Sequence, residues 1–273
     1  MSFSSGSTKT SRILIDSGPF GGRPRKPKSC PPKHLGPKLS PETSHPTLDI
    51  QPIIWIMVPM ETTRYRKGIK PVHSAQVLKK GSGNKKLGFK VTSAKWRGSR
   101  LYSLTLTERA TCPRSCHHWD DCYGNNMPFA HRFETKDLMP KLESEIIELL
   151  GKHKDGITIR LHVLGDFYSV EYVEFWERML LEHPKLTIFG YTARMRGTAI
   201  GSAIWLLNVR YSDRCVIRYS SSQDTNSLGE WFAAEESFEG KSFNCPEQTG
   251  KVKDCASCGL CWTTPKTVRF ATH

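Results

Sequence analysis

Seven of the nine cysteines fall into two tight groups, and this clustering constrains the fold more than any other feature of the sequence. A thiolate holds a metal only when the chain brings further ligands to the same point, so each group predicts a loop folded around a metal centre. The first cysteine group is Cys112, Cys116 and Cys122, and the second is Cys245, Cys255, Cys258 and Cys261.

The compartment expected for this chain favours metal ligation over disulfide bonding. The apolar stretch at 53–59 is far too short to span a membrane, and residues 1–40 lack the apolar core of a secretion signal. We therefore expect a cytoplasmic protein with no membrane partner. In a reducing compartment, clustered cysteines are more often metal ligands than disulfides.

The second group has the spacing C-x2-C-x2-C, with Cys245-Pro246 upstream. Three thiolates at such short intervals, completed by a remote cysteine before a proline, are typical of a ferredoxin-like [4Fe–4S] cluster. Zinc held by four thiolates is the alternative, although structural zinc usually takes two CxxC pairs. We expect the iron–sulfur cluster.

The first group offers three thiolates, spaced C-x3-C-x5-C. On a four-iron cluster this leaves one iron open, where a substrate or the methionyl end of S-adenosylmethionine can bind. A side chain of the same loop could instead be the fourth ligand, and zinc with three cysteines and one histidine is a further alternative. The candidate side chains are His117, His118, Asp120 and Asp121.

Strand and helix patterns alternate through the middle of the chain. Alternating or β-branched segments predict strands over 99–108, 157–165, 186–193 and 214–222. Apolar residues at helical spacing predict helices over 137–151, after Ser169 and over 199–208. This order favours an α/β fold with a parallel sheet and crossover helices.

Composition divides the chain into three regions. Residues 1–48 are rich in Ser, Gly, Pro and Lys, and they predict a disordered basic arm in which Cys30 is a free thiol. We expect an α/β core that includes the first cysteine loop over 49–240. A C-terminal iron–sulfur segment is expected over 241–273.

Polar residues cluster where the 157–165 strand ends. Ligands bind at the carboxyl ends of parallel strands, so we interpret Arg160, His162 and Asp166 as catalytic candidates around the first cysteine group. Ser169 and Arg194 are candidates for cofactor binding at the same edge. In the alternative reading, Asp166 and Ser169 only cap the next helix, His162 is a core residue and Arg194 lies in a solvated loop.

The net charge of +14 is concentrated in residues 61–100, which carry twelve cationic side chains against one acidic one, Glu61. A block of +11 predicts contact with the phosphates of DNA or RNA. A solvated basic surface that serves solubility is the alternative. The candidate contacts are Lys79, Lys80, Lys85, Lys86, Lys95, Arg97 and Arg100, with Tyr65 and Trp96 as base-stacking candidates.

Several motifs in order resemble a known family. A strand, a three-cysteine loop, a helix and further parallel strands resemble the radical S-adenosylmethionine superfamily. The segments TCPRSCHHWDDCYG, LHVLGDFYSVEYVEFW, FGYTAR and CPEQTGKVKDCASCGLCW together resemble the phage-associated gene product 88 family over roughly 100–262. This resemblance implies a cluster-bearing fold, which we expect to be a partial, open TIM-like barrel, but no particular reaction.

The first cysteine group departs from the usual radical-enzyme spacing C-x3-C-x2-C, and no Gly-Gly-Glu segment follows the next strand. Two functions therefore remain open. The leading one is a radical-enzyme-like protein with two [4Fe–4S] clusters that acts on nucleic acid, with S-adenosylmethionine as a candidate ligand and an electron-donor protein as a candidate partner. The other is a non-enzymatic iron–sulfur protein that binds DNA or RNA in a structural or redox-sensing role. A zinc-binding nucleic-acid-binding protein is the second alternative.

Overall fold

The computed structural model describes residues 63–93, 95–220, 232–235 and 242–271. The chain divides into two compact units, Met1–Trp55 and Ile56–His273, and every described residue belongs to the second. The predicted basic arm, with Cys30, and the apolar stretch at 53–59 lie outside the described residues. Within the described ranges, no helix is both long and apolar enough to cross a membrane.

An eight-stranded sheet forms the centre of this unit, in the order β2-β3-β5-β6-β7-β8-β10-β9. Every neighbouring pair is parallel except β2 and β3, which are antiparallel. The strands are β2 (Lys79–Lys80), β3 (Arg100–Ser103), β5 (Ile157–Leu161), β6 (Leu186–Thr192), β7 (Cys215–Ser220), β8 (Phe232–Glu235), β9 (Ser242–Asn244) and β10 (Thr267–Phe270).

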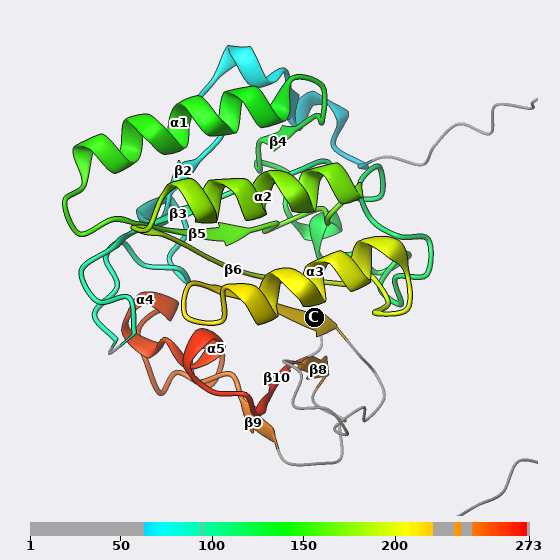
Figure 1. Cartoon of the computed structure of the whole chain (residues 1–273). Helices are drawn as coiled ribbons and strands as arrows, with labels where there is room; N and C mark the ends of the chain where they lie inside the picture. The colour runs from blue at the N-terminus through cyan, green and yellow to red at the C-terminus, as the bar shows by residue number, and fades with distance from the viewer. Residues whose placement is uncertain (1–62, 94, 221–231, 236–241, 272–273) are drawn as a thin grey trace, which may run out of the picture. The chain divides into compact units, whose positions relative to one another are not determined.

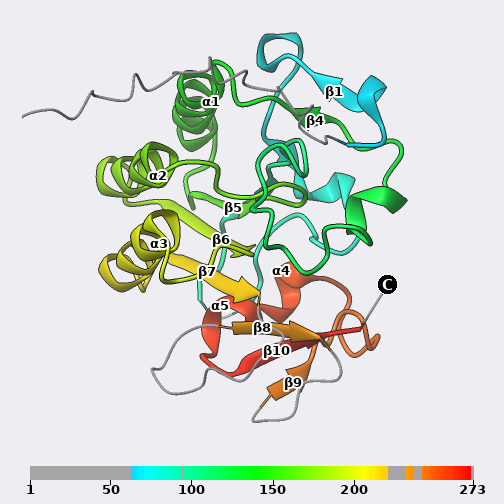
Figure 2. The same ribbon diagram turned by 90° about the vertical axis from the view of Figure 1, so that its right-hand side faces the viewer.

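Three long helices cover one face of the sheet, as Figures 1 and 2 show. They are α1 (Leu138–Lys152), α2 (Val170–Glu182) and α3 (Ala199–Arg210). Strands β3, β5, β6 and β7 follow one another across the sheet in chain order, so each crossover returns on the same side. The structure confirms the α/β class with parallel strands, and the eight described strands form an open sheet rather than a closed barrel.

The remaining elements are short. A two-stranded parallel sheet pairs β1 (Ile69–Lys70) with β4 (Arg132–Phe133). Four 3-10 turns are η1 (Arg66–Gly68), η2 (Val72–Ser74), η3 (Gly81–Gly83) and η4 (Tyr123–Asn126). Two one-turn helices, α4 (Cys255–Cys258) and α5 (Leu260–Thr263), carry the last three cysteines of the second group.

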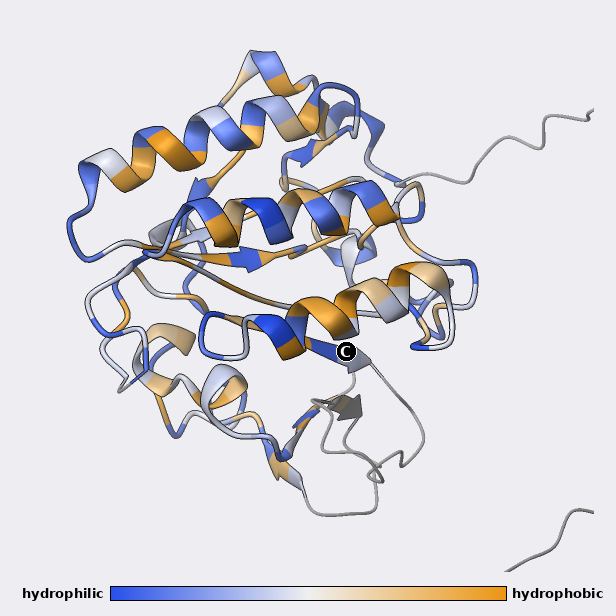
Figure 3. Cartoon of the chain, viewed as in Figure 1, coloured by the Kyte–Doolittle hydropathy of each residue, from blue (hydrophilic) through white to orange (hydrophobic). Residues whose placement is uncertain are grey.

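Local sequence signals locate α1 and α2 where they are predicted. Helix α1 buries Leu138, Leu142, Ile146 and Leu149 against the sheet, and Figure 3 shows the stripe beside a polar outer face. Helix α2 begins after Ser169, whose hydroxyl accepts a hydrogen bond from the Tyr172 amide at 3.2 Å.

The two faces of the sheet pack into separate apolar cores. Alternate residues of the strands, such as Ile159 and Ile188, pack under the three long helices. Their neighbours in sequence point the other way, and Phe189 packs there with Val91 and with Trp262 of α5. The second cysteine group is therefore built against the face of the sheet that the long helices leave uncovered (Figure 2).

The C-terminal region shares this sheet. Strand β10 lies between β8 and β9 and is parallel to both, so residues on either side of position 241 are joined by main-chain hydrogen bonds. Two predicted strands are shorter than expected. The strand predicted over 99–108 spans only Arg100–Ser103. The strand predicted over 157–165 ends at Leu161, because His162 and Gly165 adopt positive φ angles of 53° and 84° that no strand accommodates.

Candidate metal centre

A cavity of about 510 Å³ lies at the carboxyl ends of the parallel strands. Residues that end or directly follow β5, β6, β7 and β10 line it, as expected for the ligand-binding edge of a parallel sheet. Thiols of both cysteine groups line the same cavity. They are Cys112, Cys116 and Cys122 of the first group and Cys245, Cys255 and Cys261 of the second.

The start of the first cysteine loop is fixed to the ends of β5 and β6. Thr111 donates a hydrogen bond to the Thr107 carbonyl at 2.9 Å and accepts one from the Asp166 amide at 3.1 Å. Arg194 donates to the carbonyls of Thr111 and Phe167, both at 2.7 Å. These contacts place Cys112 directly beside the strand ends.

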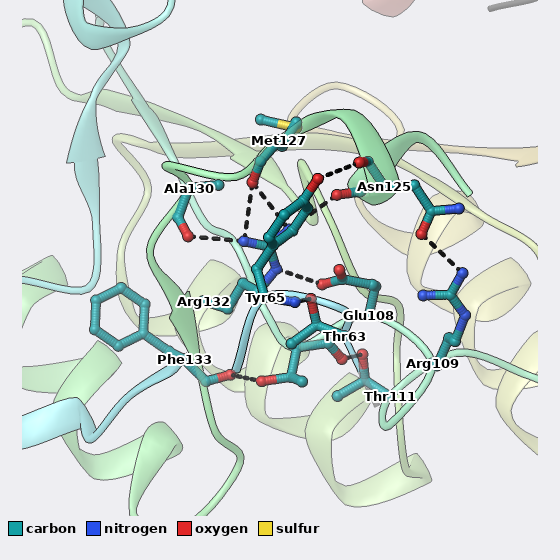
Figure 4. Close-up of polar contacts among 12 residues, drawn as sticks. Thr63, Tyr65, Glu108, Arg109, Thr111, Asn125, Met127, Ala130, Arg132 and Phe133 are labelled. Atoms are coloured by element: carbon teal, nitrogen blue, oxygen red, sulfur yellow. Dashed lines mark hydrogen bonds and ion pairs between the residues drawn. The ribbon is translucent and has the colours of Figure 1, made fainter. Parts of the chain in front are cut away.

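The far end of the same loop is organised around the fully buried guanidinium of Arg132 (Figure 4). Its Nε donates to Glu108 Oε2 at 2.7 Å. Its two Nη groups donate to the carbonyls of Gly124, Met127 and Ala130 at 2.8–3.1 Å. One side chain therefore shapes the turn that follows Cys122.

The thiols of the first group are buried enough to remain protonated when no metal is bound. Burial raises the pKa of Cys112 to about 12, and the nearby Asp166 carboxylate raises it further. Burial also raises the pKa of Cys116 and of Cys122. A bound metal would have to displace these protons, as at other thiolate sites.

Main-chain hydrogen bonds join the second cysteine group to residues 86–93. The Cys255 amide donates to the Lys86 carbonyl at 2.8 Å, and the Ala256 amide donates to the Leu87 carbonyl at 3.0 Å. Gly259, which separates α4 from α5, has a φ of 68°, and a Cβ there would collide with Ser93. The turn between Cys258 and Cys261 thus requires glycine.

Aromatic and cationic side chains complete this packing. Trp262 stacks on Trp96 with the ring centroids 5.3 Å apart. The buried Arg218 donates to the carbonyls of Cys261, Thr264 and Lys266 at 2.6–3.0 Å. These contacts fix the main chain on both sides of α5.

The second group's thiols lie close enough to influence one another. Burial raises the pKa of Cys255, and the neighbouring Cys261 and Cys245 thiols raise it further. Burial also raises the pKa of Cys258, with Cys245 as a further cause. The Tyr191 hydroxyl donates a hydrogen bond to Cys261 Sγ at 3.1 Å, a contact that the sequence does not reveal.

The three catalytic candidates line the same cavity as the first cysteine group. Arg160 donates to the Leu161 carbonyl, and its guanidinium lies 4.4 Å from the centroid of the Tyr191 ring. The strand predicted over 157–165 ends at Leu161, so His162 does not continue the alternation of the strand. His162 turns instead toward Tyr172, whose hydroxyl lies 3.2 Å from Nε2.

His162 and Asp166 are both buried, and burial shifts their pKa values in opposite directions. Burial lowers the pKa of His162 to about 3, with the Arg160 cation as a second cause, so the ring is neutral near neutral pH. Burial raises the pKa of Asp166 to about 6, against hydrogen bonds from Thr192, Ala193 and Phe167. His162 Nδ1 has no hydrogen-bond partner among the described residues.

The side chains of both cofactor-binding candidates make hydrogen bonds within the fold. Ser169 caps α2, and Arg194 ties the first cysteine loop to the residue after Asp166. Neither is among the residues that line the cavity. Among the other candidate ligands from the first loop, His117, His118 and Asp121 line the cavity and Asp120 does not.

The seven predicted nucleic-acid contacts differ in exposure. Lys80, Lys85, Lys86 and Arg97 are exposed, whereas the other three are partly buried. Of these three, Lys95 donates to the Ser212 carbonyl at 3.0 Å. Lys79 lies 5.7 Å from the ring centroid of Phe133, and Arg100 lies 4.2 Å from that of Phe89.

Both aromatic residues proposed for base stacking have partners within the fold. Trp96 stacks on Trp262 and donates to the Asp213 carbonyl at 2.7 Å. The Tyr65 hydroxyl donates to the Asn125 carbonyl at 2.6 Å. Only the exposed cations of the basic block therefore remain as contacts for a polyanion.

No group of three or more His, Cys, Asp or Glu side chains in the described ranges is arranged to hold a metal ion. The cavity also contains Glu108, which sequence analysis missed. A lone acid beside a buried strand gives no local signal. Its pairing with Arg132 depends on contact between residues 24 positions apart.

Comparison with known proteins identifies relatives in phages. The chain is 24% identical over 160 residues to the Gene 88 protein of Mycobacterium phage L5, a match that covers 51% of this chain and 64% of that protein. It is 24% identical over 167 residues to the Gene 88 protein of Mycobacterium phage D29, covering 51% and 65%. The matches thus span just under two thirds of the relatives' length.

No solved structure matches the chain. The family model described as Gene product 88 matches residues 76–237, more than half of the sequence. That range includes the first cysteine loop, helices α1 to α3 and strands β2 to β8. The resemblance read from the motifs is confirmed, and the chain belongs to the gene product 88 family.

Proposed function

We propose that this protein is an iron–sulfur protein that holds two [4Fe–4S] clusters, one on each cysteine group. The observation that carries the proposal is the shared cavity, because six of the seven clustered cysteines line it from two distant parts of the chain. Soft thiolates that converge at the carboxyl edge of a parallel sheet suit iron–sulfur chemistry. They do not suit hard-cation binding, which uses oxygen ligands.

The environment of each group fits such clusters. Each group supplies soft thiolate ligands from one short stretch of chain, as iron–sulfur clusters require. Arg160 and Arg218 lie near Cys261 and would offset negative charge on the second cluster. The first group would keep a non-cysteine position that faces the cavity.

For the first group, the finer proposal is radical-enzyme-like chemistry. A four-iron cluster with an open iron supplies one electron at a position where S-adenosylmethionine can bind. The chain's own residues would orient the ligand. Arg160 supplies a cation for a carboxylate, and neutral His162 presents Nδ1 as a hydrogen-bonding atom in the cavity wall.

Strand order supports a partial, open TIM-like barrel as the framework for this chemistry. Four parallel strands run in chain order with all three long helices on one face, which is the winding that barrels use. Alternating faces would be expected of a doubly wound sheet. The cavity would then correspond to the top of the barrel, where active sites form.

We further propose nucleic acid as the polyanion that contacts this protein. Lys86 is both exposed and part of the cavity lining, so the basic block reaches the rim of the site. Phosphates bound by Lys80, Lys85, Lys86 and Arg97 would place a nucleotide near the first cysteine group. An electron-donor protein would be a second partner.

One observation favours a second, non-enzymatic function. The Lys86 carbonyl accepts the Cys255 amide, so the basic segment and the second cysteine group share main-chain hydrogen bonds. Gain or loss of a cluster there would reshape the surface that binds nucleic acid. The protein would then act as a redox-sensing DNA- or RNA-binding protein rather than as an enzyme.

Anaerobic purification with iron, sulfide and zinc analysis tests the main proposal. We expect brown protein with about eight irons per chain, because each site would hold a four-iron cluster. Cys116→Ser and Cys258→Ser should each remove about half of the iron. Cys215→Ala is the matched control, since this buried cysteine lies outside both groups and should leave the iron content unchanged.

Stoichiometric zinc without sulfide would overturn the iron–sulfur proposal and leave the zinc alternative. If the clusters are present, addition of S-adenosylmethionine separates the two functions. A changed spectrum of the reduced cluster with formation of 5′-deoxyadenosine supports the enzyme. An unchanged spectrum without cleavage supports the non-enzymatic protein.

Binding of duplex and single-stranded nucleic acid as a function of salt tests the partner. Affinity should fall with a log–log slope of about −0.9 per duplex phosphate contact. Replacing Lys80, Lys85, Lys86 and Arg97 by Gln should flatten the slope. The control variant replaces four exposed cations outside the block by Gln and should leave the slope unchanged. These cations are Lys136, Lys154, Lys185 and Lys251. Binding that is absent at low salt would contradict the proposal.

A further inference from the structure

The Glu108 carboxylate lies in an unusual environment. The residue is 1% exposed, and its Oε2 accepts a hydrogen bond from Arg132 Nε at 2.7 Å. Its second oxygen, Oε1, is equally buried and has no hydrogen-bond partner among the described residues. An ionised oxygen removed from water without a partner is costly, so such an atom calls for an explanation.

Packing alone does not explain the second oxygen. Glu145 is a buried glutamate of similar exposure, at 4%, and both of its oxygens accept hydrogen bonds from the Val77 amide. Oε2 of Glu145 also accepts one from the Leu78 amide. The fold therefore satisfies a buried carboxylate fully where its role is structural, and it leaves half of Glu108 unsatisfied.

The unpartnered oxygen lies beside the first cysteine group. Glu108 lines the cavity together with Cys112, Cys116 and Cys122. A Cβ at Gly124, two residues after Cys122, would lie 2.8 Å from Glu108 Oε1. Only glycine leaves that oxygen its present space.

Arg132 holds the carboxylate in one orientation. The guanidinium is itself fixed by the carbonyls of Gly124, Met127 and Ala130, which belong to the turn after Cys122 (Figure 4). Carboxylates that bind metals are commonly held in this way, with one oxygen on the metal and the other on a hydrogen-bond donor. The arrangement prepares Oε1 for a cationic partner and excludes rotation away from it.

We propose that Glu108 is the non-cysteine ligand of the metal centre on the first cysteine group, through Oε1. This inference rests on the proposed iron–sulfur function and adds a fourth ligand to it. Because a carboxylate on the fourth iron closes the position that S-adenosylmethionine would need, the assignment favours the non-enzymatic alternative over the radical-enzyme one. Its competitors from the loop are less suited, since His117, Asp120 and Asp121 are exposed to solvent and Nδ1 of the partly exposed His118 lies 3.1 Å from Asp121 Oδ1. Glu108 also precedes Cys112 in the chain, so the ligand set reaches beyond the cysteine loop itself.

Two sets of variants test the assignment by metal readouts rather than by activity. Glu108→Gln keeps an acceptor for Arg132 but replaces the charged ligand. We expect it to retain the second cluster and to lose one iron of the first cluster to chelator or mild oxidation at least about tenfold more readily than wild type, as altered ligand environments weaken metals by about 10–100-fold. A three-iron signal in electron paramagnetic resonance would report the loss. Glu145→Gln is the matched control.

The second set does not depend on the stability of a Glu108 variant. Mössbauer spectroscopy of wild type should show one iron of the first cluster distinct from those with four sulfur ligands. This distinct iron should persist when His117, His118, Asp120 and Asp121 are all replaced by Ala, because these side chains lie in an accessible loop. Persistence supports Glu108, and disappearance overturns the assignment in favour of the loop.

The outcomes separate this inference from the function on which it rests. Wild-type protein with about eight irons and sulfides, but with Glu108→Gln as resistant to chelator as wild type, would overturn the ligand assignment alone. Wild-type protein without iron or sulfide would overturn the iron–sulfur function, and the Glu108 assignment with it.

Discussion

Side chains hold the first cysteine group in place, whereas main-chain hydrogen bonds and aromatic packing hold the second. Around the first, Arg132 and Arg194 donate to six groups of the cysteine loop and the adjoining strand end. Around the second, amides of α4 donate to residues 86–87, and Trp262 lies in an apolar core. The difference separates a polar loop that faces the cavity from a segment built into the sheet.

We expect the two cysteine groups to differ in role. The polar loop lies beside Glu108, His162 and Asp166, all at the cavity wall. The second group contributes thiols to the same cavity, but its main chain is fixed by contacts that involve few titratable groups. We therefore expect changes near the first group to alter chemistry and metal retention, and changes near the second to alter stability or reduction potential.

The largest expected effect is the loss of Arg132. Arg132→Met leaves Glu108 buried without a cation and frees three carbonyls of the turn, and breaking a buried ion pair from one side costs about 3–5 kcal/mol. Chemical denaturation would measure the loss. Arg178→Met is the control, since its pairing with Glu143 is exposed and worth at most about 1 kcal/mol. Equal losses in both variants would contradict the central role of Arg132.

A smaller effect is expected in the turn of the second group. Gly259→Ala introduces left-handed strain of about 1–2 kcal/mol and a collision with Ser93. Gly250→Ala introduces the same strain, at a φ of 70°, with open space around the new methyl group. The difference in unfolding free energy between the two variants isolates the collision. No difference would show that the turn relaxes freely.

The pH dependence of stability should distinguish His162 from Asp166. Burial lowers the folded-state pKa of His162 to about 3, below its ordinary value of 6.5. Its contribution is therefore complete above pH 6.5 and is lost as the pH falls toward 3, at up to about 1.4 kcal/mol per pH unit. His162→Gln should flatten this slope, as measured by denaturation between pH 4 and 7. An unchanged slope would contradict the burial of a neutral ring.

The contribution of Asp166 to stability should depend on pH in the opposite direction. Burial raises its folded-state pKa to about 6 from 3.8, so its contribution is complete below pH 3.8 and is lost as the pH rises through 6. Wild type should therefore lose stability as the pH rises from 4 to 6, and Asp166→Asn should not show this loss. Asn keeps only one acceptor oxygen, so the hydrogen bonds donated by Thr192 and Ala193 cannot both persist, and stability should be lower at every pH, which denaturation at fixed pH would measure.

The smallest effect is expected for the hydrogen bond between Tyr191 and Cys261. A donor to a ligating sulfur stabilises the more negative, reduced cluster. Removing it in Tyr191→Phe should lower the reduction potential of the proposed second cluster by about 20–60 mV, as one hydrogen bond is worth roughly 0.5–1.5 kcal/mol. Redox titration would measure the shift. A shift in the first cluster instead would contradict the separation of the two groups.

The sequence predicts what depends on local pattern. Helical spacing of apolar residues locates α1, and the hydroxyl of Ser169 marks the start of α2. The alternation of strand and helix predicts parallel strands, and therefore predicts that Arg160 and Asp166 reach the same edge of the sheet.

What the sequence does not predict depends on contact between distant residues. Nothing near Glu108 indicates that Arg132 will pair with one of its oxygens. Nothing near Trp96 indicates that Trp262 will cover its ring, and an exposed aromatic in a basic segment suggests a base-stacking residue instead. The left-handed turn at His162 ends its strand early although the residues there favour extension.

The position of β10 between β8 and β9 has a consequence for assembly. Both neighbours precede β10 in the chain, and among the described strands β9 pairs with β10 alone, so β9 joins the sheet only when the final strand is in place. Such late, non-local pairing is slow relative to the formation of α1 to α3 with their strands. During synthesis, therefore, the first cysteine loop exists before the wall that carries Cys255 and Cys261 can close.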